Sequence, residues 1–297
     1  MGFVPKGIIP ALVTPLDREE RLNEQALRQL VNYLIEGGVH GLFPVGSQGE
    51  FFALEYEEKV RVMEVVAEEA KGRIPVYGGT GAITTREAIR LTRAAESIGM
   101  DAVSIITPFF LYPSQDELYD HYTAIAASTK LPVVLYNNPG RTGGVNLGVG
   151  LVTRLAQIDN IVGIKDSSGD MTLTGEYIRR TDRDKFSVLA GRDTMIYATL
   201  CYGGQGSITA TGNVCPRLVS EIYESFLRGE HEKAREAQYR LAPLRLAFEL
   251  GSFPVVIKEA LEMMGIPAGP SRSPVKGLTS EKREELRRIL QGMDLLG

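Results

Sequence analysis

Lys165 is the residue of this sequence that is best placed to do covalent chemistry. It ends an apolar run at 161–164 and is followed by Asp166 and a polar segment. An amine drawn into an apolar strand end has its charged form disfavoured, so the free amine becomes available to attack a carbonyl and form an imine. The alternative is a lysine that leads into a solvated loop and pairs with Asp166. Strand-end placement alone leaves both interpretations open.

Tyr136 ends the apolar run 132–136, the last such run before the one that ends in Lys165. If the two runs are neighbouring strands, the two side chains approach each other at the strand tips. A phenol within hydrogen-bond reach of an amine can relay the protons that imine formation requires. A tyrosine that only packs at the rim of a barrel is the alternative, and for a tyrosine taken alone it is the commoner case.

The sequence GSQGE at 46–50 follows directly after the apolar run GLFPV. Its glycines allow a sharp turn with accessible backbone N–H groups, and Ser47 adds a hydroxyl donor, so the turn is able to hold a small carboxylate. Taken alone, it is equally compatible with any glycine-rich turn between a strand and a helix.

A second glycine-rich turn, at 79–81, also follows a strand-like run and precedes a helical one. With Asp101 farther along the chain, it is similar to a dinucleotide-binding fingerprint, which would make the protein a pyridine-nucleotide dehydrogenase. However, Thr84 stands where the third glycine of the fingerprint belongs. We therefore interpret the segment as an ordinary strand-to-helix loop.

The elements that must position these residues alternate between short β-rich runs and amphipathic helical segments. Several helical segments open with Ser, Thr or Asn and close with Gly. This pattern predicts an α/β fold, a (β/α)8 TIM barrel over residues 1–225, with the active site at the C-terminal ends of the strands. The eight expected strands are 8–13, 41–45, 74–78, 101–106, 132–136, 161–165, 186–190 and 205–209.

After about residue 215 only helical patterns remain. Residues 226–297 are therefore expected to form a C-terminal helical extension of the barrel. A doubly wound open sheet is the main alternative to the barrel, but it usually has fewer strands, and the regular spacing here favours closure.

Composition excludes several classes of function. The chain has 297 residues, 43% of them hydrophobic, which is enough for one large core, and its net charge of −4 without a basic run argues against a nucleic-acid partner. Its apolar stretches are too short for a membrane span, and Pro5 and Pro10 interrupt any signal peptide, so we expect a cytoplasmic protein. Cys201, Cys215 and the scattered histidines lack metal-ligand spacing, so no metal or cofactor is expected.

Three segments combine into a more specific pattern. GLFPVGSQGEF, YNNPGRTG and NIVGIKDSSGD occur in this order, each at an expected strand end. From about Gly7 to Pro274 the chain resembles the dihydrodipicolinate synthase and N-acetylneuraminate lyase family of class I pyruvate-dependent aldolases. The resemblance implies a metal-independent Schiff-base mechanism on pyruvate and an aldehyde, with no cofactor. It also implies a homo-oligomer, a tetramer built as a dimer of dimers.

The resemblance further implies roles for individual residues. The Schiff-base lysine of the family corresponds to Lys165 and its catalytic tyrosine to Tyr136. The Ser47 hydroxyl and the Gln48 backbone N–H hold the carboxylate of pyruvate, and Arg141 corresponds to the arginine that synthases use to hold aspartate semialdehyde. The substrate-binding positions of the family are occupied here by Ser47, Gln48, Arg141, Phe110 and, through its carbonyl, Ile208.

Two positions depart from the synthases of lysine biosynthesis. Gln48 replaces a second hydroxyl residue, and Phe110 replaces a tyrosine that reaches a neighbouring subunit. The relay of protons between hydroxyl groups is therefore incomplete. Tyr112, two residues beyond Phe110, is a candidate substitute for the missing tyrosine.

The choice of branch within the family rests on a few short patterns. The pattern G-S-x-G-E-F, the pair Lys165-Asp166 and the segment FPVVIKEALEMMG look similar to aldolases that act on 4-hydroxy-2-oxo acids or 2-keto-3-deoxy sugar acids. The sequence therefore favours an aldolase that joins pyruvate to an aldehyde or cleaves the product. Arg141 favours the alternative, a 4-hydroxy-tetrahydrodipicolinate synthase. A keto-deoxy acid dehydratase and a barrel that only binds a keto acid are further alternatives.

Overall fold

One parallel sheet forms the centre of the protein in the computed structural model, which describes residues 3–296. Its strands follow the order β1-β7-β6-β5-β4-β3-β2. The order never reverses in the way that defines a doubly wound sheet, which excludes that alternative. The strands are β1 (Gly7–Pro10), β2 (Tyr77–Gly79), β3 (Ala102–Ile106), β4 (Val133–Asn137), β5 (Ile161–Asp166), β6 (Ser187–Ala190) and β7 (Gly206–Thr209).

The segment 41–45, predicted as a strand, is the one β-rich run that does not form a regular strand. It makes only isolated parallel bridges, which are Ala11–Phe43 and Leu42–Val76. Pro44 has no N–H group, and Val45 has a φ of 60°, so the segment is unable to continue a regular ladder. The sheet thus has seven regular strands where the sequence predicted eight, and the bridged segment lies between its two edges.

Successive side chains of each strand point to opposite faces of the curled sheet, which gives the protein two apolar layers. Ile8 and Val133 face outward and pack beneath the helices, whereas their neighbours Ile9 and Val134 face inward. The inner layer contains Ile9, Ala11, Phe43, Tyr77, Ala102, Val134, Val162, Leu189 and Ile208. Every strand, together with the segment 41–45, therefore contributes to one interior.

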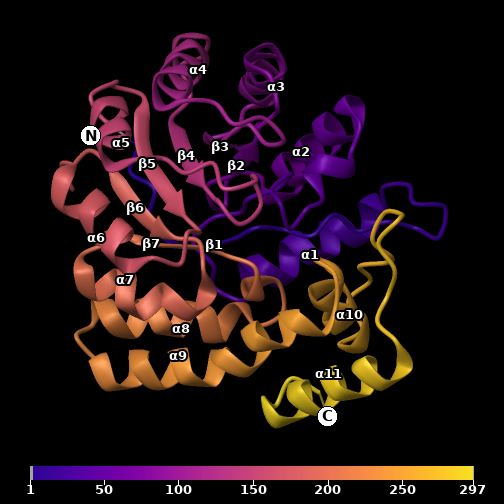
Figure 1. The fold of residues 1–297 in the computed structure, drawn as a ribbon. Helices are drawn as coiled ribbons and strands as arrows, with labels where there is room; N and C mark the ends of the chain where they lie inside the picture. Colours follow the sequence, from indigo (N-terminus) through magenta and orange to yellow (C-terminus); the bar gives the residue numbers. More distant parts are fainter. Residues whose placement is uncertain (1–2, 297) are drawn as a thin grey trace.

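Helices cover the outside of the sheet (Figure 1), as the sequence pattern predicted. Their starts follow capping rules: the Asn23 side chain accepts a hydrogen bond from the backbone N–H of Ala26, and Ser114 and Glu117 form a capping box. The helices of this layer are α1 (Glu24–Glu36), α2 (Tyr56–Ala70), α3 (Thr85–Ile98), α4 (Gln115–Ala127), α5 (Val149–Leu155), α6 (Met171–Arg180), α7 (Ile196–Tyr202) and α8 (Pro216–Leu227).

Three further helices form the C-terminal region, α9 (His231–Leu246), α10 (Val255–Met263) and α11 (Ser280–Gly292). Within this region of helical sequence pattern, α9 ends at Leu246 and a 3-10 turn follows. Pro243 has no N–H to donate to the preceding turn, which weakens the end of this helix. Figure 1 shows α10 and α11 together on one side of the molecule.

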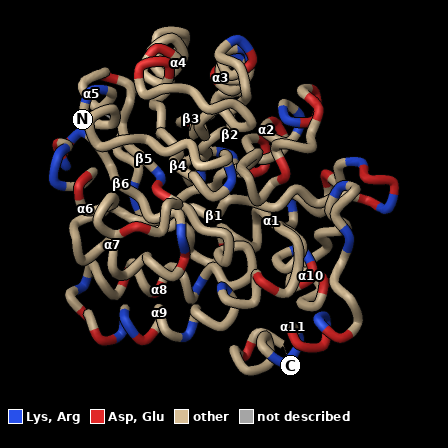
Figure 2. The backbone as a smooth tube through the Cα atoms, in the orientation of Figure 1, with Lys and Arg blue, Asp and Glu red and all other residues tan. Residues whose placement is uncertain are grey.

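Charged residues lie mainly on the outer helices and their connecting loops, while the strands at the centre carry few (Figure 2). This distribution follows from the cost of placing charge in an apolar interior. Within residues 3–296, none of the helices combines the length and the apolar character needed to span a membrane.

Candidate active site

Lys165 lies near the end of β5, and its side chain lines a cavity of about 310 Å³. The residue is only 5% exposed. It is in register with Tyr136 on the neighbouring strand β4, and its Nζ lies 4.1 Å from the centroid of the Tyr136 ring. The structure therefore brings the two side chains together at adjacent strand tips.

The carboxylate of Asp166 has other partners than its neighbour Lys165. It accepts hydrogen bonds from the backbone N–H of Ser168 at 3.0 Å and from the Ser168 hydroxyl at 2.9 Å. It also accepts one from the hydroxyl of Thr174 at 2.6 Å. These contacts hold Asp166 at the start of the strand-to-helix turn, so the solvated Lys165–Asp166 pair that the sequence allowed does not describe the site.

The phenol of Tyr136 is surrounded by polar groups. The Asn138 side chain donates a hydrogen bond to the phenol oxygen at 2.9 Å, and the Ser47 hydroxyl lies 3.5 Å from the same oxygen. Burial by itself raises the pKa of Tyr136, but the positive charge of Lys165 and the hydrogen bonds outweigh it and place the pKa below the usual 10.0. The phenol therefore releases its proton more readily than an ordinary tyrosine, which suits a proton relay.

The turn at 46–50 forms another wall of the cavity, through Ser47 and Gln48. The carbonyl of Gly46 accepts hydrogen bonds from the backbone N–H groups of Gly49 at 3.0 Å and Phe51 at 3.3 Å, which closes the turn. Within the described part of the chain, neither polar atom of the Gln48 side-chain amide has a hydrogen-bond partner. The turn at 46–50, called the cradle below, thus lies in the same cavity as the Lys165 amine and the Tyr136 phenol, in a position suited to holding a carboxylate.

Three arginines line the same cavity, Arg141, Arg192 and Arg245. Arg141 stacks on the ring of Phe253 at 4.4 Å, and Arg245 stacks on the ring of Phe248 at 4.6 Å. Burial lowers the pKa of Arg141, and repulsion from Arg245 lowers it further, although Tyr136 opposes both effects. Together with Lys165, these arginines outnumber Asp193, the acidic residue that lines the same cavity, so the cavity is suited to anionic substrates.

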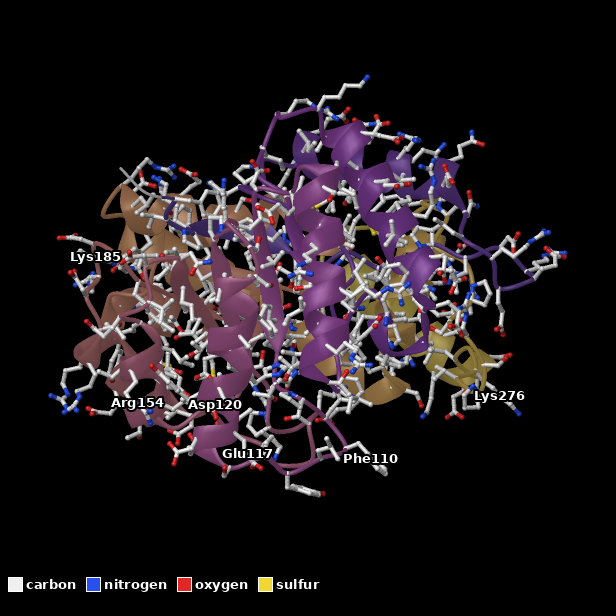
Figure 3. The ribbon with its side chains drawn as sticks, turned by 90° about the horizontal axis from the view of Figure 1, so that it is seen from above. Phe110, Glu117, Asp120, Arg154, Lys185 and Lys276 are labelled. Atoms are coloured by element: carbon white, nitrogen blue, oxygen red, sulfur yellow. The ribbon has the colours of Figure 1, made fainter. Side chains whose placement is uncertain are left out.

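The remaining two predicted positions lie differently. Ile208 is buried on β7 and lines the cavity. Phe110 is 86% exposed, has a φ of 72° and does not line the cavity. It lies at the periphery of the molecule, as Figure 3 shows. Within one chain, the structure brings Phe110 to the surface rather than to the site.

Sequence reasoning missed several residues that line or order the cavity. Asn138 lies in the quoted segment YNNPGRTG, and Arg192 and Asp193 follow the end of β6. The expectation that active-site residues follow the C-terminal ends of the strands could therefore have identified all three. The buried Asp193 accepts a hydrogen bond from the backbone N–H of Thr211 at 2.7 Å, which orders the loop after β7. Arg245 comes from α9, and no local signal in the sequence points to it.

The glycine-rich turn at 79–81 has a packing role. A side chain on Gly79 would lie 2.1 Å from the carbonyl oxygen of Val45. The backbone N–H of Thr80 donates to the carbonyl of Ser104 at 3.2 Å, so it is not free to bind a phosphate. The turn is a strand-to-helix loop, as the missing third glycine indicated.

Comparison with known proteins agrees with this geometry. Residues 4–293 match the Dihydrodipicolinate synthetase family. The 4-hydroxy-tetrahydrodipicolinate synthase of Archaeoglobus fulgidus is 40% identical over 291 residues, 98% of this chain and 99% of that protein. The synthase of the same name from Methanoculleus marisnigri is 42% identical over 287 residues, 96% and 98% of the two chains. The solved dihydrodipicolinate synthase of Thermotoga maritima has a TM-score of 0.95 at 33% identity, covering 99% of this chain and 100% of that one. This chain belongs to the dihydrodipicolinate synthetase family.

Proposed function

We propose that this chain is a 4-hydroxy-tetrahydrodipicolinate synthase that condenses pyruvate with aspartate semialdehyde. The observation that carries the proposal is the convergence of the Lys165 amine, the Tyr136 phenol and the Ser47 hydroxyl in one cavity. The names of the relatives support this reaction over the keto acid aldolase that the short sequence patterns favoured. Both reactions belong to the same class, the carbon–carbon lyases that use pyruvate.

The chemistry follows from the three converging groups. The Lys165 amine attacks the ketone of pyruvate, and water leaves as protons pass through the Tyr136 phenol. The protonated imine then draws electrons from the adjacent methyl carbon, which loses a proton and gives an enamine. The enamine carbon attacks the aldehyde carbon and the aldehyde oxygen takes up a proton, so the new carbon–carbon bond forms while the imine is restored. The amino group of the adduct then attacks the imine carbon, which closes the ring and releases the Lys165 amine.

The substrates are oriented by their carboxylates. The Ser47 hydroxyl and the Gln48 backbone N–H hold the carboxylate of pyruvate beside the Lys165 amine, with the carbonyl of Ile208 facing the keto acid. Arg141, stacked at the cavity mouth, holds the carboxylate of the aldehyde substrate. The two substrates therefore meet between the strand tips and the C-terminal helices.

One observation favours a second candidate, cleavage of a keto acid that carries a further anionic group. Arg192 and Arg245 line the cavity in addition to Arg141, and the aldehyde of the proposed reaction has only one carboxylate. Surplus positive charge at the mouth is better matched by a 4-hydroxy-2-oxo dicarboxylic acid or an anionic keto-deoxy sugar acid.

One experiment separates the two reactions. The purified enzyme is given pyruvate with aspartate semialdehyde, and separately a panel of 4-hydroxy-2-oxo acids and 2-keto-3-deoxy sugar acids. We expect condensation with aspartate semialdehyde to have a kcat/KM at least roughly 100-fold above any cleavage reaction, a margin typical of a site that pairs with the correct polar groups. Faster cleavage of a keto acid would replace the proposed reaction with the second candidate.

We also propose the higher-order organisation that the sequence predicted: a complete (β/α)8 barrel over residues 1–225, a helical extension over 226–297, and a homo-oligomer. Support for the barrel comes from the bridges of segment 41–45 to both sheet edges. Support for the oligomer comes from the consecutive exposed side chains of Phe110, Leu111 and Tyr112, which form an apolar projection suited to burial against a second copy.

A further inference from the structure

A buried ion pair joins two segments that are 208 residues apart along the chain. Lys258 Nζ donates to Glu50 Oε1 at 2.7 Å, and each side chain is only 2% exposed. Burying two charges is expensive unless they are paired and hydrogen-bonded, so such a pair adds little net stability, and in some proteins its role is to fix a particular geometry.

Glu50 is the last residue of the turn that carries Ser47 and Gln48. Its backbone N–H donates to the carbonyl of Ser47 at 3.1 Å, and its φ of 58° places it in the left-handed region that few residues other than glycine adopt. The turn is also held at Gly49, whose carbonyl accepts a hydrogen bond from the Thr14 hydroxyl at 2.7 Å. The backbone of Glu50 is therefore fixed as the end of the same turn.

The other side of the contact is the C-terminal region. Lys258 lies on α10 and also donates to the carbonyl of Pro270 at 2.6 Å, while the second oxygen of Glu50 accepts the backbone N–H of Arg272 at 2.9 Å. The carboxylate of Glu50 thus connects the turn to α10 and to the loop that follows it. Displacing either segment would leave a buried charge without its partner.

Neither Glu50 nor Lys258 lines the catalytic cavity or the adjoining cavity that Gln48 also lines. The pair therefore lies outside the space in which a substrate would bind, and its connection to that space runs through the turn that carries Ser47 and Gln48. A displacement of the cradle by about 1 Å is enough to lower the efficiency of a positioned site by roughly 100-fold. The contact is consequently in a position to control the geometry of carboxylate binding.

We propose that the buried Glu50–Lys258 pair is a positioning device by which the C-terminal helices hold the turn at 46–50 in the shape that binds the carboxylate of pyruvate. The inference rests on the proposed function, because it assigns a cause to the pyruvate affinity of the same site. It gives the C-terminal region a role in substrate binding in addition to packing.

The test compares Lys258→Met, Glu50→Gln and the double variant with the unmodified protein. Pyruvate is titrated with borohydride present, and the half-saturation concentration for labelling is measured together with steady-state kcat and the thermal midpoint. Each single variant leaves one charge buried without its partner, which threatens folding. The double variant removes both charges and keeps the comparison possible if a single variant fails to fold.

The control is Glu259→Gln, on the same helix as Lys258. Glu259 pairs with Arg283 at 2.7 Å and so joins α10 to α11 without contacting the turn. We expect this variant to retain the half-saturation concentration for pyruvate of the unmodified protein. The control therefore separates a general loosening of α10 from loss of the contact with the cradle.

We expect the double variant to raise the pyruvate half-saturation concentration at least roughly 10-fold while kcat at saturating pyruvate changes by less than about threefold. This split between KM and kcat is not expected of a pair that only stabilises the fold. An unchanged half-saturation concentration in the folded double variant would overturn the inference alone. Absence of any adduct in the unmodified protein would overturn the proposed function, and the inference with it.

Discussion

Replacing Tyr136 by phenylalanine removes one oxygen atom from the centre of the site. The ring that lies 4.1 Å from the Lys165 amine is kept, while the phenol that contacts Ser47 and Asn138 is lost. General acid–base catalysis typically contributes about 10²- to 10⁴-fold to a rate, which corresponds to about 2.7–5.4 kcal/mol of transition-state stabilisation. We therefore expect kcat to fall by at least roughly 100-fold.

The stability of Tyr136→Phe should change much less than its rate. The variant loses the hydrogen bond that the half-buried Asn138 donates at 2.9 Å and the longer contact with Ser47 at 3.5 Å, a loss of about 1 kcal/mol in the free energy of unfolding. The assay is the rate of imine formation with pyruvate, followed by quenching with borohydride, alongside steady-state turnover and thermal unfolding.

The matched control is Tyr122→Phe. Tyr122 is completely buried, and its phenol donates to the carbonyl of Ile105 at 3.1 Å, away from the cavity. This variant should lose stability without losing the rate of imine formation. A Tyr136→Phe protein that forms the imine within about threefold of the normal rate would refute the relay and leave Tyr136 with a packing role.

Three further predictions concern the substrate, pH and assembly. Arg141→Ala should raise the KM for aspartate semialdehyde at least roughly 10-fold, because a charge-assisted contact is lost, and should leave the rate of imine formation unchanged. Equal KM values in the variant and the unmodified protein would show that Arg141 does not bind this substrate. Burial lowers the pKa of His121 from 6.5 to about 4, so the folded protein favours the neutral imidazole. The free energy of unfolding should therefore fall by up to about 3 kcal/mol as the pH is lowered from 6.5 toward 4. His121→Asn should flatten that loss in pH-dependent thermal unfolding, and an unchanged profile would contradict it. Phe110→Asp should shift the protein toward smaller species in sedimentation velocity, whereas an unaltered distribution would exclude this surface from assembly.

The strand-end rule explains why much of the site was predictable from sequence. Lys165, Tyr136 and the turn at 46–50 each follow an apolar run, and parallel strands bring their C-terminal ends to one edge. The proximity of Lys165, Tyr136 and the turn therefore follows from the local hydrophobic pattern and from the parallel order of the strands. The same pattern misjudged segment 41–45, because Pro44 and the φ of Val45 prevent a regular ladder in an otherwise β-rich run.

Contacts between segments far apart in the chain were not predictable in this way. Arg245 reaches the cavity from α9, and Lys258 reaches Glu50 from within the apolar segment of α10. Neither residue follows a strand, and amphipathic periodicity only places them on helices. Their roles depend on how the C-terminal helices pack against the rest of the protein, which a single sequence does not encode in any local motif.

The central claim is that Lys165 carries pyruvate as an imine, and peptide mapping after borohydride reduction tests it directly. The protein contains a second buried lysine, Lys258, which is paired with Glu50 and does not line the cavity. We predict one stable adduct with pyruvate, on the peptide containing Lys165, and none in Lys165→Ala. An adduct on Lys258 or on a surface lysine, or no adduct on any peptide, would contradict the account.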